Sequence, residues 1–90
     1  MRKMGFNAVV DLIMQERAHQ NNKHGPIEKC PHEVGTWVLL IEDELREAEQ
    51  ALIKGGKGRD TWSHELVQVA ALCIAALEQH GMTEKEGRAI

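Results

Sequence analysis

Aromatic residues are scarce in this sequence, and positive charge is not in excess. Only Phe6, Trp37 and Trp62 among the 90 residues are aromatic, so the hydrophobic core is expected to be aliphatic. The formal net charge of −3 argues against nucleic-acid binding, which needs basic surface to neutralise phosphates. No nucleic-acid partner is therefore expected.

Long hydrophobic runs are also missing. No run reaches the roughly 18 residues of a membrane span, and no basic-then-apolar signal segment opens the chain. The sequence therefore predicts a cytoplasmic protein without a membrane partner. A disulfide between Cys30 and Cys73 is not expected, because Cys73 lies in an apolar helical segment and fits there as a small core residue.

The composition that is present is typical of one small globular domain over residues 1–90, with 42% hydrophobic and 28% charged residues. Apolar spacings of three and four predict helices from about Gly5 to His24 and from about Glu33 to Lys54. A third helix is expected from an N-cap at Asp60 or Thr61 to His80.

No alternating pattern of the kind that predicts a strand occurs, so the expected fold class is all-α. Short connections predict a small antiparallel helical bundle of three main helices. A capping-box pattern at Thr83–Glu86 adds a short last turn or helix. Because so small a core often gains stability by association, a homo-dimer or homo-tetramer is expected.

The first two predicted helices each carry an apolar stripe that is expected to face the core. On the first helix the stripe consists of Phe6, Val9, Val10, Ile13 and Arg17. On the second it consists of Val34, Val38, Ile41, Leu45, Ala48 and Leu52, with Trp37 on its flank.

Acidic and amide side chains lie beside these apolar surfaces. Glu44 and Glu47 are neighbours at i and i+3 on the flank of the second helix, and Asp43 lies beyond them. On the third helix Glu65 lies within the apolar circumference, with Gln68 adjacent to it. If the two helices pack antiparallel, these side chains face one another across the seam.

Carboxylates gathered in this way repel one another unless a cation neutralises them. Mg²⁺ or Mn²⁺, which prefer carboxylate and amide oxygens, would meet that need at Glu44, Glu47, Glu65 and Gln68.

Two plainer interpretations stay open. The acids of the second helix form a solvated face, or Glu65 pairs with Arg17 or Lys23. A zinc site is not expected, because "HELVQ" lacks the second histidine of H-E-x-x-H.

These residues resemble the MazG-like all-α nucleoside triphosphate pyrophosphohydrolases, in particular the short single-domain members often found in phages. That family has E-x-x-E on one helix and E-x-x-D on the next. Here Glu44 and Glu47 form the first element, and Glu65 begins the second after a gap of 17 residues. "ERAHQNNKHG" is similar to the family's ER-x-x-Q-x-x-K-W-G stretch, and "TWVLLIEDELREA" to its tryptophan-led metal helix.

The resemblance extends over about residues 12–78 and has two departures. Gln68 stands where the family has aspartate, which removes a negative ligand, and His24 replaces the tryptophan of the first-helix stretch.

The resemblance implies hydrolysis of a (deoxy)nucleoside triphosphate to the monophosphate and pyrophosphate. Glu44, Glu47 and Glu65 would hold Mg²⁺, or Mn²⁺ in its place, and Gln68 would offer its amide oxygen or orient a water. Glu47 or Asp43 is the candidate general base, since a base need only reach the attacking water.

Three further residues are candidates for substrate binding. Arg17 and Lys23 would contact phosphates, and Trp37 would stack on a base. Each also has a structural interpretation, as a solvated or snorkelling cation or as a core tryptophan. The alternative function is a catalytically weak or inactive helical protein that keeps the fold and binds a nucleotide or dimerises, and Gln68 favours it.

Overall fold

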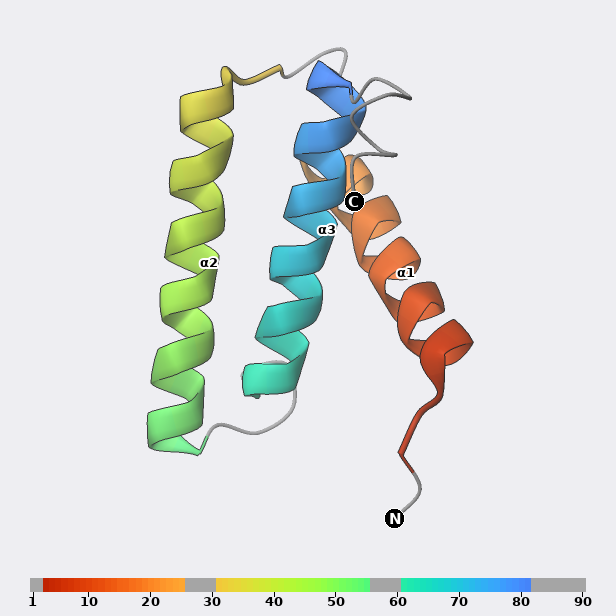
Figure 1. Ribbon diagram of the computed structural model, residues 1–90, viewed down its shortest axis with the longest axis vertical. Helices are drawn as coiled ribbons and strands as arrows, with labels where there is room; N and C mark the ends of the chain where they lie inside the picture. Colours follow the sequence, from red (N-terminus) through yellow and green to blue (C-terminus); the bar gives the residue numbers. More distant parts are fainter. Residues whose placement is uncertain (1–2, 26–30, 56–60, 82–90) are drawn as a thin grey trace, which may run out of the picture.

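Three helices make up the part of the chain that the computed structural model describes, which is residues 3–25, 31–55 and 61–81. Helix α1 spans Phe6–His24, α2 spans Val34–Lys54 and α3 spans Trp62–His80 (Figure 1). These bounds match the predicted helices, and no strand occurs within the described ranges, so the all-α prediction is confirmed. The turn predicted at residues 83–86 lies outside them.

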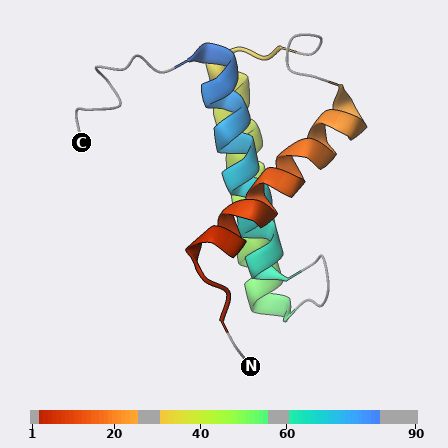
Figure 2. The same cartoon turned by 90° about the vertical axis from the view of Figure 1, so that its right-hand side faces the viewer.

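Helix α3 is the central element of the bundle. It packs against both α1 and α2. Helices α2 and α3 lie side by side and run in opposite directions, as the sequence predicted (Figure 1). Figure 2 shows that α1 crosses α3 obliquely instead of lying parallel to it. Helix α3 therefore lies between α2 and α1 (Figure 1).

The helix ends follow from local residue chemistry. Thr61 caps α3, because its side-chain oxygen accepts a hydrogen bond of 3.3 Å from the backbone N–H of His64. The predicted N-cap at Thr61 is thereby confirmed, whereas Asp60 lies outside the described residues. Gly55 ends α2 with a φ of 67° in the left-handed region, and its N–H bonds to the carbonyl of Ala51.

The buried apolar residues are mostly small. Among the described residues they are Trp37, Ala48, Ala71 and Ala75, and no large side chain is completely buried. Ala48 is on α2, and Ala71 and Ala75 are on α3, so the buried parts of both helices consist largely of small side chains. The acidic residue Glu65 is buried on α3 as well.

The predicted apolar stripe of α2 is largely wrong for the single chain. Ala48 is buried and Ile41 is half-buried, but the other four stripe residues are exposed: Val34, Val38, Leu45 and Leu52. The face that packs on α3 is instead rotated toward Trp37, Leu40 and Glu44. One neighbouring helix covers only part of the broad apolar surface of α2, and the small residue Ala51 lies on the covered side.

The stripe predicted on α1 is also only partly covered. Val10 and Ile13 are half-buried and Arg17 is buried, whereas Phe6 is 81% exposed and Val9 is exposed. The inward face of α1 continues past Ile13 in polar residues. It therefore places charged and amide groups, not apolar ones, against the rest of the bundle.

No helix in the described part of the chain is long and apolar enough to cross a membrane. Cys73 is half-buried on α3 and has a free thiol. Its possible partner Cys30 lies outside the described residues.

Substituting Gly55 tests how α2 ends. Gly55→Ala is expected to lower the free energy of unfolding by about 1 kcal/mol, because alanine disfavours left-handed backbone. Gly35→Ala is the matched control, since Gly35 is helical and open space surrounds its missing Cβ. It is expected to raise the free energy of unfolding by up to about 1 kcal/mol. Urea unfolding followed by circular dichroism measures both, and equal effects would contradict this role of Gly55.

Candidate functional site

Three glutamates meet at the seam between α2 and α3. One carboxylate oxygen from each of Glu44, Glu47 and Glu65 lies within 4.8 Å of the others. Glu65 is 8% exposed, Glu44 is half-buried and Glu47 is exposed, so the group runs from the bundle interior to its surface. Antiparallel packing of the two helices brings together acids that are far apart in sequence.

Gln68 lies one helical turn after Glu65 and joins this group. With its amide nitrogen directed at the carboxylates, Gln68 donates to Glu65 Oε2 at 2.8 Å and to Glu44 Oε2 at 2.9 Å. With the amide turned over, its oxygen faces the same two carboxylates and could act as a fourth oxygen ligand for a cation. The residue therefore serves either as a hydrogen-bond donor or as a neutral ligand.

The electrostatics of the site follow from this crowding. Desolvation by burial raises the pKa of Glu44 from its ordinary 4.5 to about 7, and hydrogen bonding and repulsion from Glu47 and Glu65 act in the same direction. A proton on Glu44 relieves the repulsion in the isolated chain. A bound cation would relieve it in the same way and favour the charged carboxylate.

A cavity of about 770 Å³ opens beside the glutamates. Its lining includes Glu44, Glu47 and Asp43 from α2 and Gln68 from α3. Helix α1 contributes a wall of charged, imidazole and amide side chains: Glu16, Arg17, His19, Gln20, Asn21 and Lys23. Small-molecule sites in proteins have volumes of roughly 300–1,000 Å³, so the cavity is large enough for a nucleotide.

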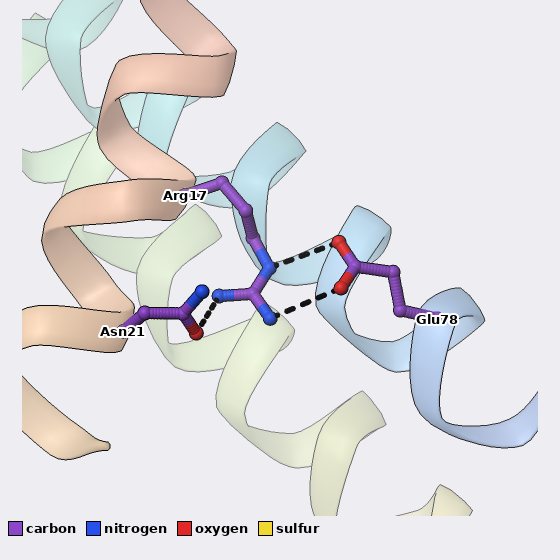
Figure 3. Close-up of polar contacts among 3 residues, drawn as sticks. All are labelled: Arg17, Asn21 and Glu78. Carbon is purple, nitrogen blue, oxygen red and sulfur yellow. Dashed lines mark hydrogen bonds and ion pairs between the residues drawn. The ribbon is translucent and has the colours of Figure 1, made fainter. Parts of the chain in front are cut away.

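Arg17 is held in place on this wall (Figure 3). Its Nε and Nη2 donate to the two carboxylate oxygens of Glu78 at 3.2 and 3.3 Å, and Nη1 donates to Asn21 Oδ1 at 2.6 Å. The sequence left open an ion pair of Arg17 with Glu65. The ion pair that the structure shows for Arg17 is with Glu78. Lys23 is exposed and lines the cavity as well.

Asp43, a candidate base, is exposed at the edge of the same cavity. Its carboxylate pairs with Arg46 one turn along α2, at 3.1 Å. Glu47, the other candidate, belongs to the glutamate group itself. Both candidates therefore face the space that a substrate would occupy.

Trp37 forms part of the core. It is 6% exposed, and its indole Nε1 donates to Gln79 Oε1 at 2.9 Å. The ring of His32 meets its ring edge-on, with centroids 4.9 Å apart. Gln79 also accepts from the backbone N–H of His32, which ties the start of α2 to the end of α3. Trp37 still borders the cavity, whereas Trp62 does not line it.

Sequence reasoning missed two polar residues of α1. Glu16 is buried, lines the cavity and has an Oε1 3.9 Å from His64 Nε2. Gln20 also lines the cavity, and its buried Oε1 accepts no hydrogen bond from the residues that the structure describes. Both positions continue the inward stripe of Val10 and Ile13 at helical spacing. That continuation was the available signal, because inward positions with polar side chains often mark a site.

Comparison of the chain with known protein families, with curated proteins and with solved structures finds no match. The likeness to the MazG-like family therefore stays a prediction from sequence motifs.

The pH dependence of stability tests the electrostatics of Glu44. A folded-state pKa of about 7, above the ordinary 4.5, means that the folded chain binds the proton more tightly than the unfolded chain. The contribution of Glu44 to the free energy of unfolding is therefore expected to be greatest below about pH 4.5 and to fall as the pH rises through about 7.

Glu44→Gln should remove that part of the pH dependence, because the amide does not titrate. Glu42→Gln is the control, since Glu42 is exposed and lies outside the glutamate group. Urea unfolding without divalent cations at about pH 5 and about pH 8 measures the difference. Identical pH profiles for wild type and Glu44→Gln would contradict the predicted shift.

Proposed function

We propose that the chain is a metal-dependent hydrolase of the MazG-like kind, converting a (deoxy)nucleoside triphosphate to the monophosphate and pyrophosphate. The observation that carries the proposal is the meeting of Glu44, Glu47 and Glu65 beside a nucleotide-sized cavity. Arg17 and Lys23 on the α1 side of the cavity add support, because a triphosphate is strongly anionic.

The donor set suits a hard divalent cation. Carboxylate and amide oxygens are the ligands that Mg²⁺ and Mn²⁺ prefer. Burial raises the pKa of Glu44, and hydrogen bonding and repulsion from Glu47 and Glu65 add to the shift, so the charged form of Glu44 is unfavourable in the isolated chain. Glu44, Glu47 and Glu65 would hold the ion, and Gln68 would turn its amide oxygen toward it.

A divalent cation held by Glu44, Glu47 and Glu65 would supply positive charge against the phosphate oxygens. Glu47 or Asp43 takes the proton from the attacking water as its oxygen bonds to the α-phosphorus. The bond from that phosphorus to the oxygen bridging to the β-phosphate breaks, and pyrophosphate leaves. Arg17 and Lys23 hold the phosphate chain from α1, while Trp37 borders the same cavity.

One observation favours the non-catalytic alternative. With its amide nitrogen directed at the carboxylates, Gln68 donates hydrogen bonds to Glu44 and Glu65 in the absence of an ion. A helical protein that binds a nucleotide without hydrolysing it would retain such a site. The two functions differ in product release, not in nucleotide binding.

Pyrophosphate release from a panel of ribo- and deoxyribonucleoside triphosphates tests the proposal. Release is expected to require Mg²⁺ or Mn²⁺. Glu47→Ala and Glu65→Ala are each expected to reduce it by about 100-fold or more, because each removes a carboxylate from the proposed ion site. Glu42→Ala is the control and should keep full activity, since Glu42 does not line the cavity.

Absence of release from every triphosphate would contradict the enzyme proposal. Thermal unfolding with Mg²⁺ and a triphosphate then identifies the alternative, because a bound ligand raises the melting temperature. A shift that Glu44→Gln abolishes would indicate nucleotide binding without catalysis.

The proposal includes self-association as a homo-dimer or homo-tetramer through α2. The exposed apolar face of this helix consists of Val34, Val38, Leu45 and Leu52. With so little apolar surface buried inside one chain, a second copy packed on this face would supply the missing core.

Replacing two central residues of that face tests the association. Val38→Lys with Leu45→Lys is expected to convert the assembly to monomers, because each introduces a charge that cannot be buried unpaired. Gln50→Lys, on an exposed polar position of α2, should leave the assembly unchanged. Analytical ultracentrifugation measures the mass, and a monomeric wild type would contradict the proposal.

A further inference from the structure

Arg17 has an arrangement that differs from that of an ordinary structural arginine. Its side chain is 11% exposed, yet it lines the cavity, and three of its N–H groups are directed by Glu78 and Asn21 (Figure 3). A guanidinium carries five N–H donors. Nη1 and Nη2 therefore each keep one N–H beyond the bonds made within the described part of the chain.

The two partners fix the guanidinium at different points. Glu78 accepts two parallel hydrogen bonds, which sets the plane of the group. Asn21, one turn along α1, accepts from Nη1 and thereby limits rotation within that plane. An arginine side chain that rotates freely loses considerable entropy when it binds a ligand. The bonds to Glu78 and Asn21 already restrict Arg17, so less entropy is lost on binding.

The negative charge of Glu78 does not cancel the attraction of the Arg17 guanidinium for an anion in the cavity. Its side chain is 50% exposed, so solvent screens its charge more than that of the buried Arg17. Glu78 is also absent from the cavity lining, whereas Arg17 and Asn21 belong to it. A ligand in the cavity would contact Arg17 and not Glu78.

We infer that Glu78 is a positioning residue, which with Asn21 holds the Arg17 guanidinium on the cavity wall for a polyphosphate anion. The identification of that anion as the phosphate chain of a nucleotide rests on the proposed function. The anion site itself does not, because it follows from the Arg17 contacts and the cavity.

Binding of inorganic tripolyphosphate, measured by isothermal titration calorimetry, tests the inference without requiring catalysis. Glu78→Gln keeps the size of the side chain but has one acceptor oxygen, so the paired hydrogen bonds are lost. Its Kd is expected to rise about tenfold, equivalent to one lost charge-assisted hydrogen bond. Arg17→Lys, which keeps the charge without the fork, should weaken binding at least as much.

Glu42→Gln is the matched control. It removes the same charge from an exposed position of α2 that does not line the cavity, and it should leave the Kd within about twofold. An unchanged or lower Kd for folded Glu78→Gln would overturn the inference, because Glu78 would then only join helices or compete with the anion. A lower melting temperature of this variant does not by itself affect the binding comparison.

If the chain hydrolyses triphosphates, a second measurement applies. Glu78→Gln should raise KM several-fold while kcat stays within about twofold, since the residue acts on substrate binding through Arg17. A fall in kcat with constant KM would overturn the inference. Tripolyphosphate binding that depends on Glu78, without hydrolysis by the wild type, would support the anion site and contradict only the enzyme proposal.

Discussion

The burial and crowding of Glu44 beside Glu47 and Glu65 are the constraint on which the candidate site depends. Three carboxylates lie within a few ångströms of one another because α2 and α3 pack side by side in opposite directions. The same closeness removes water from Glu44 and raises its pKa. The packing that stabilises the helix pair therefore also creates a place where a cation, a proton or a hydrogen-bond donor is needed. Within the described part of the chain, Gln68 meets this need for Glu44 and Glu65 when its amide nitrogen is directed at them.

Helix α1 gives the cavity a wall of different chemistry. Helix α1 crosses α3 obliquely (Figure 2), and residues of its second half line the cavity together with residues of α2 and α3. The inward positions there are polar, and they keep Arg17 and Glu16 buried. Burying charged groups is unfavourable unless they have partners, and Glu78 provides one for Arg17. A cavity with carboxylates on one side and an oriented guanidinium on the other suits a ligand that combines a metal ion with an anionic chain.

The distribution of apolar surface has a separate consequence. Within one chain the buried apolar residues are few and mostly alanines, while larger ones on α2 are exposed. A single chain with so small a core has little hydrophobic stabilisation to offset the conformational entropy lost on folding. Polar ties such as those of Gln79 to Trp37 and His32 hold the ends of α2 and α3 together but do not replace that core. Self-association and ligand binding at the glutamates would each add stability that the isolated chain lacks.

Local patterns in the sequence determined the helices and their ends, because apolar spacing, a threonine N-cap and glycines at the C-termini act within a few residues. Spacing also indicated that Glu44, Glu47 and Glu65 face one seam, since each is tied to a known face of a helix. The sequence did not determine which side of the broad apolar surface of α2 is covered, and Val38 and Leu45 prove to be exposed. Nor did it determine that Arg17 pairs with Glu78, 61 positions away. Both depend on how the helices are rotated and crossed against one another, and only the tertiary structure decides that, through contacts between residues far apart in the chain.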